Sequence, residues 1–210
     1  DNSTSTSSPG VTIKDGYFYD TTLAGFDILS KGPVKITDMN SNQNNGGQAG
    51  GVIRTAGSVT LDATATGYYD YNNFGYNATN GLLIEAGGAV NIKKSSFSNN
   101  TAGYGLTVAP GASSVTMTGI RANSNSAGYG MDITASGAIT LTDFEAYDNG
   151  TYGIRMDNSG GTAGVTLSGL SSDTANAYNN PTYNLTVLTN GALKLSYLSS
   201  TDSPVAVSLP

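Results

Sequence analysis

The side chains of this 210-residue chain that could carry acid–base or metal chemistry gather most densely between positions 143 and 157. Asp143, Glu145 and Asp148 lie within one short segment, and Asp157 follows it. Cleavage of a glycosidic bond uses two carboxyl groups about 5 to 9.5 Å apart, a distance that alternate residues of one strand can meet. Because calcium takes six or more oxygen ligands, a loose calcium site is a second chemistry open to these acids.

The neighbouring repeat unit supplies no further acidic residues with which these acids could form a substrate site. The matching places in the preceding part of the chain are Gly119, Arg121 and Ser124, none of them acidic. The chain has no His and no Cys, so it lacks the commonest general base and all thiolate ligands. We therefore expect no enzymatic activity, no cofactor and no metal, with a calcium site kept as an alternative.

Charge and composition argue against two classes of partner. The net charge is −6 at pH 7, whereas nucleic-acid binding requires a basic surface. No segment approaches the roughly 20 apolar residues of a membrane span. Only 11% of residues are charged, but 38% are hydrophobic and recur at fixed intervals, so we expect a thin, linear core and not disorder.

An internal repeat determines the fold that we expect. The first apolar residue of each unit recurs at intervals of 23 to 31 residues. These anchors are Val11, Val34, Val59, Val90, Val115, Ile139, Val165 and Leu193. Units of this length suit the coils of a three-sided parallel β-solenoid. The anchors predict about eight coils in one domain, residues 11–210, after a polar extension, residues 1–10.

Each unit contains two clear segments of alternating apolar and polar residues, such as Val90-Asn91-Ile92 and Leu106-Thr107-Val108. A period of two predicts strands with one buried and one solvated face. The outward positions expected in the second strand are Ile53, Leu83, Thr107, Asp132, Arg155 and Thr186. A Gly or Asn before this strand predicts a corner with a left-handed backbone, at Gly51, Gly81, Gly105, Gly130, Gly153 and Asn184.

The outward positions favour a structural surface over a catalytic one. Asp132 and Arg155 fall on adjacent coils, so we expect an exposed ion pair between them. Rows of Thr, such as Thr116 above Thr140, are ordinary on solvated strands. The flat Thr rows of this chain resemble those of ice-binding β-solenoids, so ice binding is an open alternative. However, Lys35 interrupts one of the rows.

Several residue types keep their place from unit to unit and predict that the coils stack directly on one another. Asn44, Asn100, Asn125 and Asn149 each lie ten residues after an anchor, and amides stacked about 4.8 Å apart would form an asparagine ladder. Tyr104, Tyr129, Tyr152 and Tyr183 share one corner position and would form an aromatic column. Inside, we expect one large residue per coil, as in Ser95 with Phe97, Ile120 with Ala122, and Phe144 with Ala146.

The units ending in GYGLTV, GYGMDI and TYGIRM resemble those of the right-handed parallel β-helix proteins, the pectate-lyase-like superfamily. The resemblance covers nearly the whole chain from Val11 to Leu209 and implies an all-β, right-handed parallel β-helix. That superfamily includes polysaccharide lyases and hydrolases, phage tailspikes, adhesins and surface fibres. The resemblance therefore implies a fold and leaves the function open.

An aromatic insertion interrupts the third unit between Gly67 and Ala78. Its candidate contact residues are Tyr68, Tyr69, Tyr71, Phe74 and Tyr76. Because this many aromatic rings are unusual in a solvated loop, we expect the insertion to pack against a neighbouring subunit or a surface glycan.

Five N-x-Ser/Thr sequons could carry glycans in a secreted protein. They begin at Asn2, Asn77, Asn99, Asn149 and Asn184. A chain so rich in Asn and Thr contains several sequons by chance.

The two ends of the repeat lack a recognisable cap. Residues 1–10 are polar, and residues 204–210 still alternate like a strand. Uncovered end coils pair readily with other molecules. We expect an extracellular, secreted filament subunit that binds copies of itself head to tail, with the Asp1 start typical of a mature secreted chain. The alternatives are a carbohydrate-binding or carbohydrate-cleaving β-helix and a module of a longer adhesin.

Overall fold

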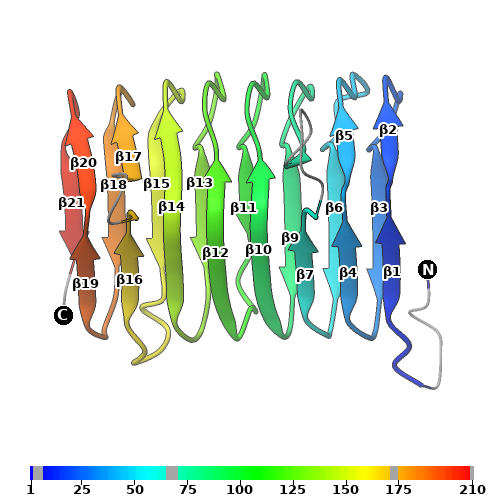
Figure 1. The fold of residues 1–210 in the computed structure, drawn as a ribbon, viewed down its shortest axis with the longest axis horizontal. Helices are drawn as coiled ribbons and strands as arrows, with labels where there is room; N and C mark the ends of the chain where they lie inside the picture. The colour runs from blue at the N-terminus through cyan, green and yellow to red at the C-terminus, as the bar shows by residue number, and fades with distance from the viewer. Residues whose placement is uncertain (2–6, 65–70, 171–174, 209–210) are drawn as a thin grey trace.

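The protein is a row of flattened coils stacked along one axis, with its two ends at opposite extremities (Figure 1). The computed structural model describes residue 1 and residues 7–64, 71–170 and 175–208. Every regular element in these residues is a β-strand, and they contain no long apolar helix of the kind that crosses a membrane. The all-β solenoid expected from the repeat is confirmed.

Each coil contributes strands to three faces. The first face stacks β1 (Val11–Lys14), β4 (Val34–Thr37), β7 (Val59–Asp62), β10 (Ala89–Ser96), β12 (Ser114–Arg121), β14 (Ile139–Tyr147), β16 (Val165–Ser168) and β19 (Leu193–Ser196). The second stacks β2 (Tyr17–Tyr19), β5 (Asn40–Asn42), β8 (Asn72–Asn73), the later parts of β10, β12 and β14, then β17 (Ala175–Tyr178) and β20 (Leu198–Thr201). The third stacks β3 (Phe26–Ser30), β6 (Gly51–Thr55), β9 (Leu82–Ala86), β11 (Leu106–Val108), β13 (Met131–Thr134), β15 (Tyr152–Asp157), β18 (Tyr183–Leu188) and β21 (Val205–Ser208).

The register between coils follows the sequence repeat. Neighbouring strands run parallel, and every anchor pairs with the anchor of the next coil, as Val90 does with Val59 and with Val115. Eight strands on the first face give seven coil-to-coil steps, close to the predicted count of about eight coils. The short strands of the second face are less evident in the sequence, because insertions displace two of them along the chain.

The core is a thin file of apolar side chains between the faces. Inward residues such as Ile92 and Leu106 are fully buried, and full burial of such a side chain stabilises the fold by about 1.5–3 kcal/mol. We expected one large inward residue per coil, at either of two positions. Ser95, Ile120 and Phe144 occupy the first of these positions and lie directly over one another on successive coils. Phe97 compensates for the small Ser95 within its own coil, and its ring stacks on that of Phe74 at 5.4 Å.

The left-handed corners lie elsewhere than the sequence predicted. None of the glycines before the third-face strands has a positive φ; instead, the residue before each ladder asparagine does, as at Ser124 (57°) and Asp148 (55°). The corner glycines are required by close approach. A Cβ on Gly105 would lie 2.3 Å from the carbonyl oxygen of Phe97 and 2.6 Å from that of Gly130.

One outward position was also assigned to the wrong side. Ile53 was expected to face solvent, but it is fully buried and pairs with Ile28 and Ile84. Gly51 itself pairs with Leu82, so in this coil the glycine takes the first place of the strand and the alternation shifts by one residue. A shift of one residue exchanges the two faces of a strand.

Candidate functional site

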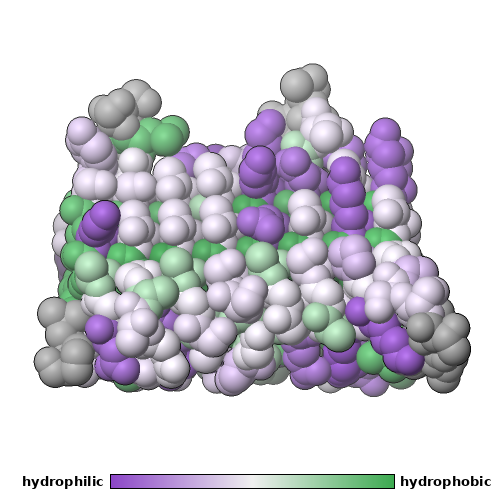
Figure 2. Space-filling view, turned by 90° about the horizontal axis from the view of Figure 1, so that it is seen from below, coloured by the Kyte–Doolittle hydropathy of each residue, from purple (hydrophilic) through white to green (hydrophobic). Residues whose placement is uncertain are grey.

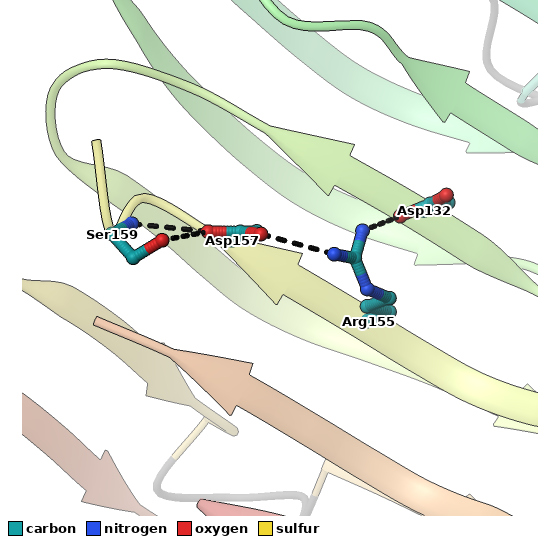
Figure 3. A network of polar contacts seen from close by, with 4 residues as sticks. All are labelled: Asp132, Arg155, Asp157 and Ser159. Carbon is teal, nitrogen blue, oxygen red and sulfur yellow. Dashed lines mark hydrogen bonds and ion pairs between the residues drawn. The ribbon is translucent and has the colours of Figure 1, made fainter. Parts of the chain in front are cut away.

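A charged network of four residues lies on the outer side of the third face (Figure 3). Arg155 of β15 reaches Asp132 on the neighbouring β13 at 2.8 Å and Asp157 on its own strand at 3.0 Å. Asp157 in turn accepts hydrogen bonds from the backbone nitrogen and the hydroxyl of Ser159, at 3.1 and 2.7 Å. The expected pair of Asp132 with Arg155 is therefore present as part of a chain of four residues, but it is partly buried and not exposed as expected, with the side chain of Asp132 20% exposed and that of Arg155 29% exposed.

The electrostatics of this network favour the ionised forms. Burial by itself would raise the pKa of Asp157, but the bonds from Ser159 and the guanidinium of Arg155 outweigh it and lower that pKa. Burial likewise opposes the charge of Arg155, but Asp132 and Asp157 raise the pKa of the guanidinium. Both groups stay charged near neutral pH. This arrangement ties two coils together and holds the carboxyl group of Asp157 in its ionised form, which has no proton to donate.

The acids near position 145 do not form one cluster, although Asp143 and Glu145 line the same open hollow. Glu145 pairs with Arg121 at 3.5 Å, and Asp148 accepts a hydrogen bond from the side chain of Asn179. Asp143 occupies a left-handed position at the bend within β14. Among the described residues, no three acidic side chains are grouped so that they could hold a metal ion.

A continuous column of asparagine side chains runs through the corner between the second and third faces. In each step, the backbone nitrogen and Nδ2 of one asparagine both donate to Oδ1 of the asparagine in the next coil; from Asn125 to Asn149 the distances are 3.1 and 2.8 Å. The column is Asn44, Asn77, Asn100, Asn125, Asn149 and Asn180, all buried. Asn184 ends it by accepting from Asn180, and Thr21 begins it by donating to Asn44.

All four asparagines predicted from the sequence lie in this column, which also contains Asn77 and Asn180, two residues that the ten-residue spacing did not predict. Both follow insertions that break the ten-residue spacing from the anchor. Counting back from the corner of the third face would have found them, because Asn77 and Asn180 each precede their corner residue by four places, as Asn149 does.

The four proposed tyrosines lie together at the edge of the third face. The ring centroids are 4.6 Å apart between Tyr104 and Tyr129, 4.5 Å between Tyr129 and Tyr152, and 5.6 Å between Tyr152 and Tyr183. The first and last pairs are stacked, and the middle pair is edge-to-face. Burial, the neighbouring tyrosines and Asp132 raise the pKa of Tyr129. The rings are partly buried and contact one another across four coils, which stabilises the stack of coils.

Comparison with known proteins gives one match. The model of a family described as the right-handed beta helix region matches residues 40–195, about three quarters of the chain. The chain belongs to the right-handed β-helix family. No curated protein and no solved structure matches the chain significantly.

The aromatic insertion of this β-helix divides between core and surface. Phe74 was proposed as a contact for a partner or a glycan, but it is fully buried between Phe97 and Phe26. It fills the interior because the inward position below it, Ser41, is small. Tyr71 lies 4.8 Å from the guanidinium of Arg121 in a cation–π contact, and Tyr76 is 56% exposed. Tyr68 and Tyr69 lie outside the described residues.

Burial separates the five sequons. The side chains of Asn77, Asn149 and Asn184 are buried, and each Nδ2 donates to a neighbouring coil or turn, so these three sites cannot carry a glycan in the folded β-helix. Asn99 is partly exposed at a left-handed corner. Asn2 lies outside the described residues.

The outer side of the first face carries the expected threonine rows. Thr116, Thr140 and Thr166 lie in register on three successive coils, as do Thr118, Thr142 and Ser168. Lys14, Lys35 and Lys194 lie in the same rows. In Figure 2 strongly hydrophilic side chains interrupt the paler rows, more often toward the N-terminal coils at the right. A regular array therefore spans only about three coils.

The last coil of the β-helix exposes residues whose counterparts are buried in the inner coils. Leu195 is 47% exposed and Val205 is 45% exposed, whereas Leu167 and Leu185, one coil inward, are buried. An open hollow of about 360 Å³ lies among these residues. Its walls include Phe144, Ala177, Leu185, Leu198, Ser200 and Val205. At the other extremity Val11, Ile13 and Phe18 are only partly buried.

Proposed function

We propose that this β-helix protein is an extracellular structural subunit whose copies join end to end into a filament. The observation that carries the proposal is the uncovered apolar interior of the last coil, with Leu195, Val205 and Val207 each more than two fifths exposed. Water-exposed apolar surface of this kind favours association, and the strand edges of the end coils offer backbone groups for pairing. The end coil of a second copy would both cover the exposed apolar surface and pair with the free strand edges.

The repeat register shows how two copies would meet. Continuing the pairing by one step sets β19 beside β1 of the next copy, with Leu193 next to Val11 and Leu195 next to Ile13. The same step sets β21 beside β3, with Val205 next to Phe26 and Val207 next to Ile28. Apolar residues meet at each of these inward places. When copies stack along one axis, this contact between two different surfaces of the molecule repeats without closing and builds a filament.

A non-catalytic role fits the placement of the charged groups. Asp132 and Asp157 are joined through Arg155, and Glu145 is paired with Arg121. An extracellular location fits a chain with few charges, and in the absence of Cys its stability is drawn from hydrogen-bonded ladders such as the asparagine column. Detection of the protein in the culture medium or on the cell surface tests the location; an exclusively intracellular protein would contradict it.

Sedimentation velocity and electron microscopy of the 210-residue chain test the assembly. We expect larger species as concentration rises and thin, unbranched rods in micrographs. Eight coils at about 4.8 Å each predict an axial repeat of about 38 Å per subunit. A monodisperse monomer throughout the millimolar range would overturn the proposal.

A second candidate function, glycan binding, is favoured by one specific surface. Tyr71, Arg121, Glu145 and Leu170 line an open hollow of about 290 Å³ on the outer side of the second face. An aromatic ring beside paired charges can hold a sugar ring by stacking and hydrogen bonds. If this function holds, Tyr71→Ala abolishes glycan binding in a glycan array and leaves assembly unchanged; loss of assembly without any glycan bound by the parent chain would exclude it. Release of new reducing ends from a bound glycan would instead show cleavage.

A further inference from the structure

The interior of the last two coils departs from the packing of the inner ones. The two inward places of the second face hold one large residue in most coils: Met39 with Ser41, Ser95 with Phe97, Ile120 with Ala122, and Phe144 with Ala146. In the next coil both places are small, Ala175 and Ala177, and in the last they are Leu198 and Ser200. The hollow of about 360 Å³ is the consequence of this missing volume.

The first coil carries a large residue in the same column. Phe18 occupies the inward place that Ser200 occupies at the far end, as the chain of paired residues from β2 through β5, β8, β10, β12, β14 and β17 to β20 shows. Phe18 is partly buried, packs against Phe26 at 5.7 Å and has no coil on its other side within the described residues. A cavity of about 150 Å³ holds a benzene ring, so the larger hollow has room for the ring of Phe18.

We propose that the hollow in the last coil is a socket and that Phe18 of a second copy of this chain enters it. The proposal rests on the filament proposed above and specifies its joint. It continues the coil-to-coil contact that already exists within the chain: Phe18 lies over the small Ser41 on one side and would lie over the small Ser200 of the other copy. Filling such a void restores the packing density of the inner coils.

The same register brings two negative charges together at the edge of this joint. Asp20 and Asp202 both occupy the left-handed corner before the asparagine column, so the joint sets them on neighbouring coils. Within the chain, the corresponding neighbours Asp148 and Asn179 form a hydrogen bond. The Asp20–Asp202 pair therefore opposes association, and Asp202→Asn should strengthen it by replacing repulsion with the bond seen inside the chain.

Cysteine pairing tests the register of the joint directly, because the chain has no Cys of its own. Tyr17 and Ser199 point outward at equivalent places of the first and last coils, so the double variant Tyr17→Cys/Ser199→Cys should form disulfide-linked multimers under oxidation. Within one chain the two sites are seven coils apart, about 34 Å, which is far beyond the reach of a disulfide. Each single variant serves as a control and should give dimers at most.

Exchange of the socket residues tests the role of Phe18. Phe18→Ala should weaken association at least tenfold, and Ser200→Phe should block it by filling the socket in advance. The double variant Phe18→Ala/Ser200→Phe moves the ring to the other side of the joint and should restore assembly. Circular dichroism of the diluted proteins confirms that each variant is folded.

The outcomes separate the two proposals. Rods that form normally from Phe18→Ala, together with no multimers from the cysteine pair, would overturn the socket and leave the filament standing. A parent chain that stays monomeric, with no response to Asp202→Asn, would overturn the filament and the socket with it. Restored assembly in the double variant and multimers from the cysteine pair would support both.

Discussion

Nδ2 of Asn125 donates to Oδ1 of Asn149 over 2.8 Å, and this bond joins two neighbouring coils inside the protein. Oδ1 of Asn125 in turn accepts from the backbone nitrogen and Nδ2 of Asn100, at 3.1 and 2.9 Å. Each asparagine is thus held from both sides at a site closed to water. The column holds the left-handed corners in line, so each coil is set directly over the one before it.

Replacing Asn125 by Ala should destabilise the fold by about 2–4 kcal/mol. The change removes the acceptor of the backbone nitrogen of Asn100 and one of the two acceptors of its Nδ2, and an unpaired buried polar group costs about 1–3 kcal/mol. Urea unfolding followed by circular dichroism measures the loss. The matched control is Asn91→Thr on the outer side of β10, which places another Thr in its row and should stay within about 0.5 kcal/mol. Equal effects of the two variants would contradict a structural role for the column.

The carboxyl group of Asp157 should make stability depend on pH in the acid range. Its pKa is lower in the folded than in the unfolded protein, so the unfolded chain binds more protons and stability rises with pH. The contribution is fully present above the ordinary Asp value of about 3.9 and is lost as pH falls through the lowered folded value.

The variant Asp157→Asn tests this pH dependence. It should be less stable than the parent at pH 7, and the difference should shrink on acidification below about pH 4. Asp62→Asn, on the outer side of β7 and outside the network with Arg155, is the control. A constant difference between parent and Asp157→Asn from pH 7 to pH 2 would show that the Asp157 charge is not the source.

A methyl group at the Gly105 corner should be poorly tolerated. The Cβ of Gly105→Ala would lie 2.3 Å from a backbone oxygen, and overpacking typically costs about 1–3 kcal/mol. Gly160→Ala is the matched change at an open site, where nothing lies within 4 Å of the new Cβ. Gly160→Ala should be neutral or raise the free energy of unfolding by up to about 1 kcal/mol, because Ala lowers the conformational entropy of the unfolded chain. Thermal unfolding of the two variants gives the comparison, and a reversed order would refute the close-approach explanation.

The aromatic column should contribute to stability mainly through ring contact. Tyr129→Ala removes contacts to Tyr104 and Tyr152 and should cost about 1–3 kcal/mol, since each aromatic pair adds about 0.5–1.5 kcal/mol. Tyr129→Phe keeps the ring and should lose much less. Denaturant unfolding followed by Tyr fluorescence suits this chain, which has no Trp. Similar losses for both variants would place the contribution in the hydroxyl group.

The limits of the sequence are visible at particular residues. The repeat predicted four members of the asparagine column, because their distance from the anchor is constant, but it missed Asn77 and Asn180 behind insertions of variable length. It placed Ile53 outside, because Gly51 was taken as the corner although Gly50 is the residue opposite the corner Gly81, and an error of one residue reverses the alternation. It counted Phe74 as a surface contact, because an aromatic residue within an insertion gives no sign of turning inward.

The sequence by itself determined that parallel coils stack in register, because a strict alternation of apolar residues in units of similar length can bury its apolar side only in that way. Only the tertiary structure decided which residues of different coils are neighbours. It showed which side chains complete the asparagine column and where the left-handed corners fall. It also showed that small residues leave a hollow in the last coil, in the column of inward positions that Phe18 occupies in the first coil. Those relationships depend on the coil-to-coil register after insertions of different length. That register is fixed by packing between coils and not by spacing along the chain.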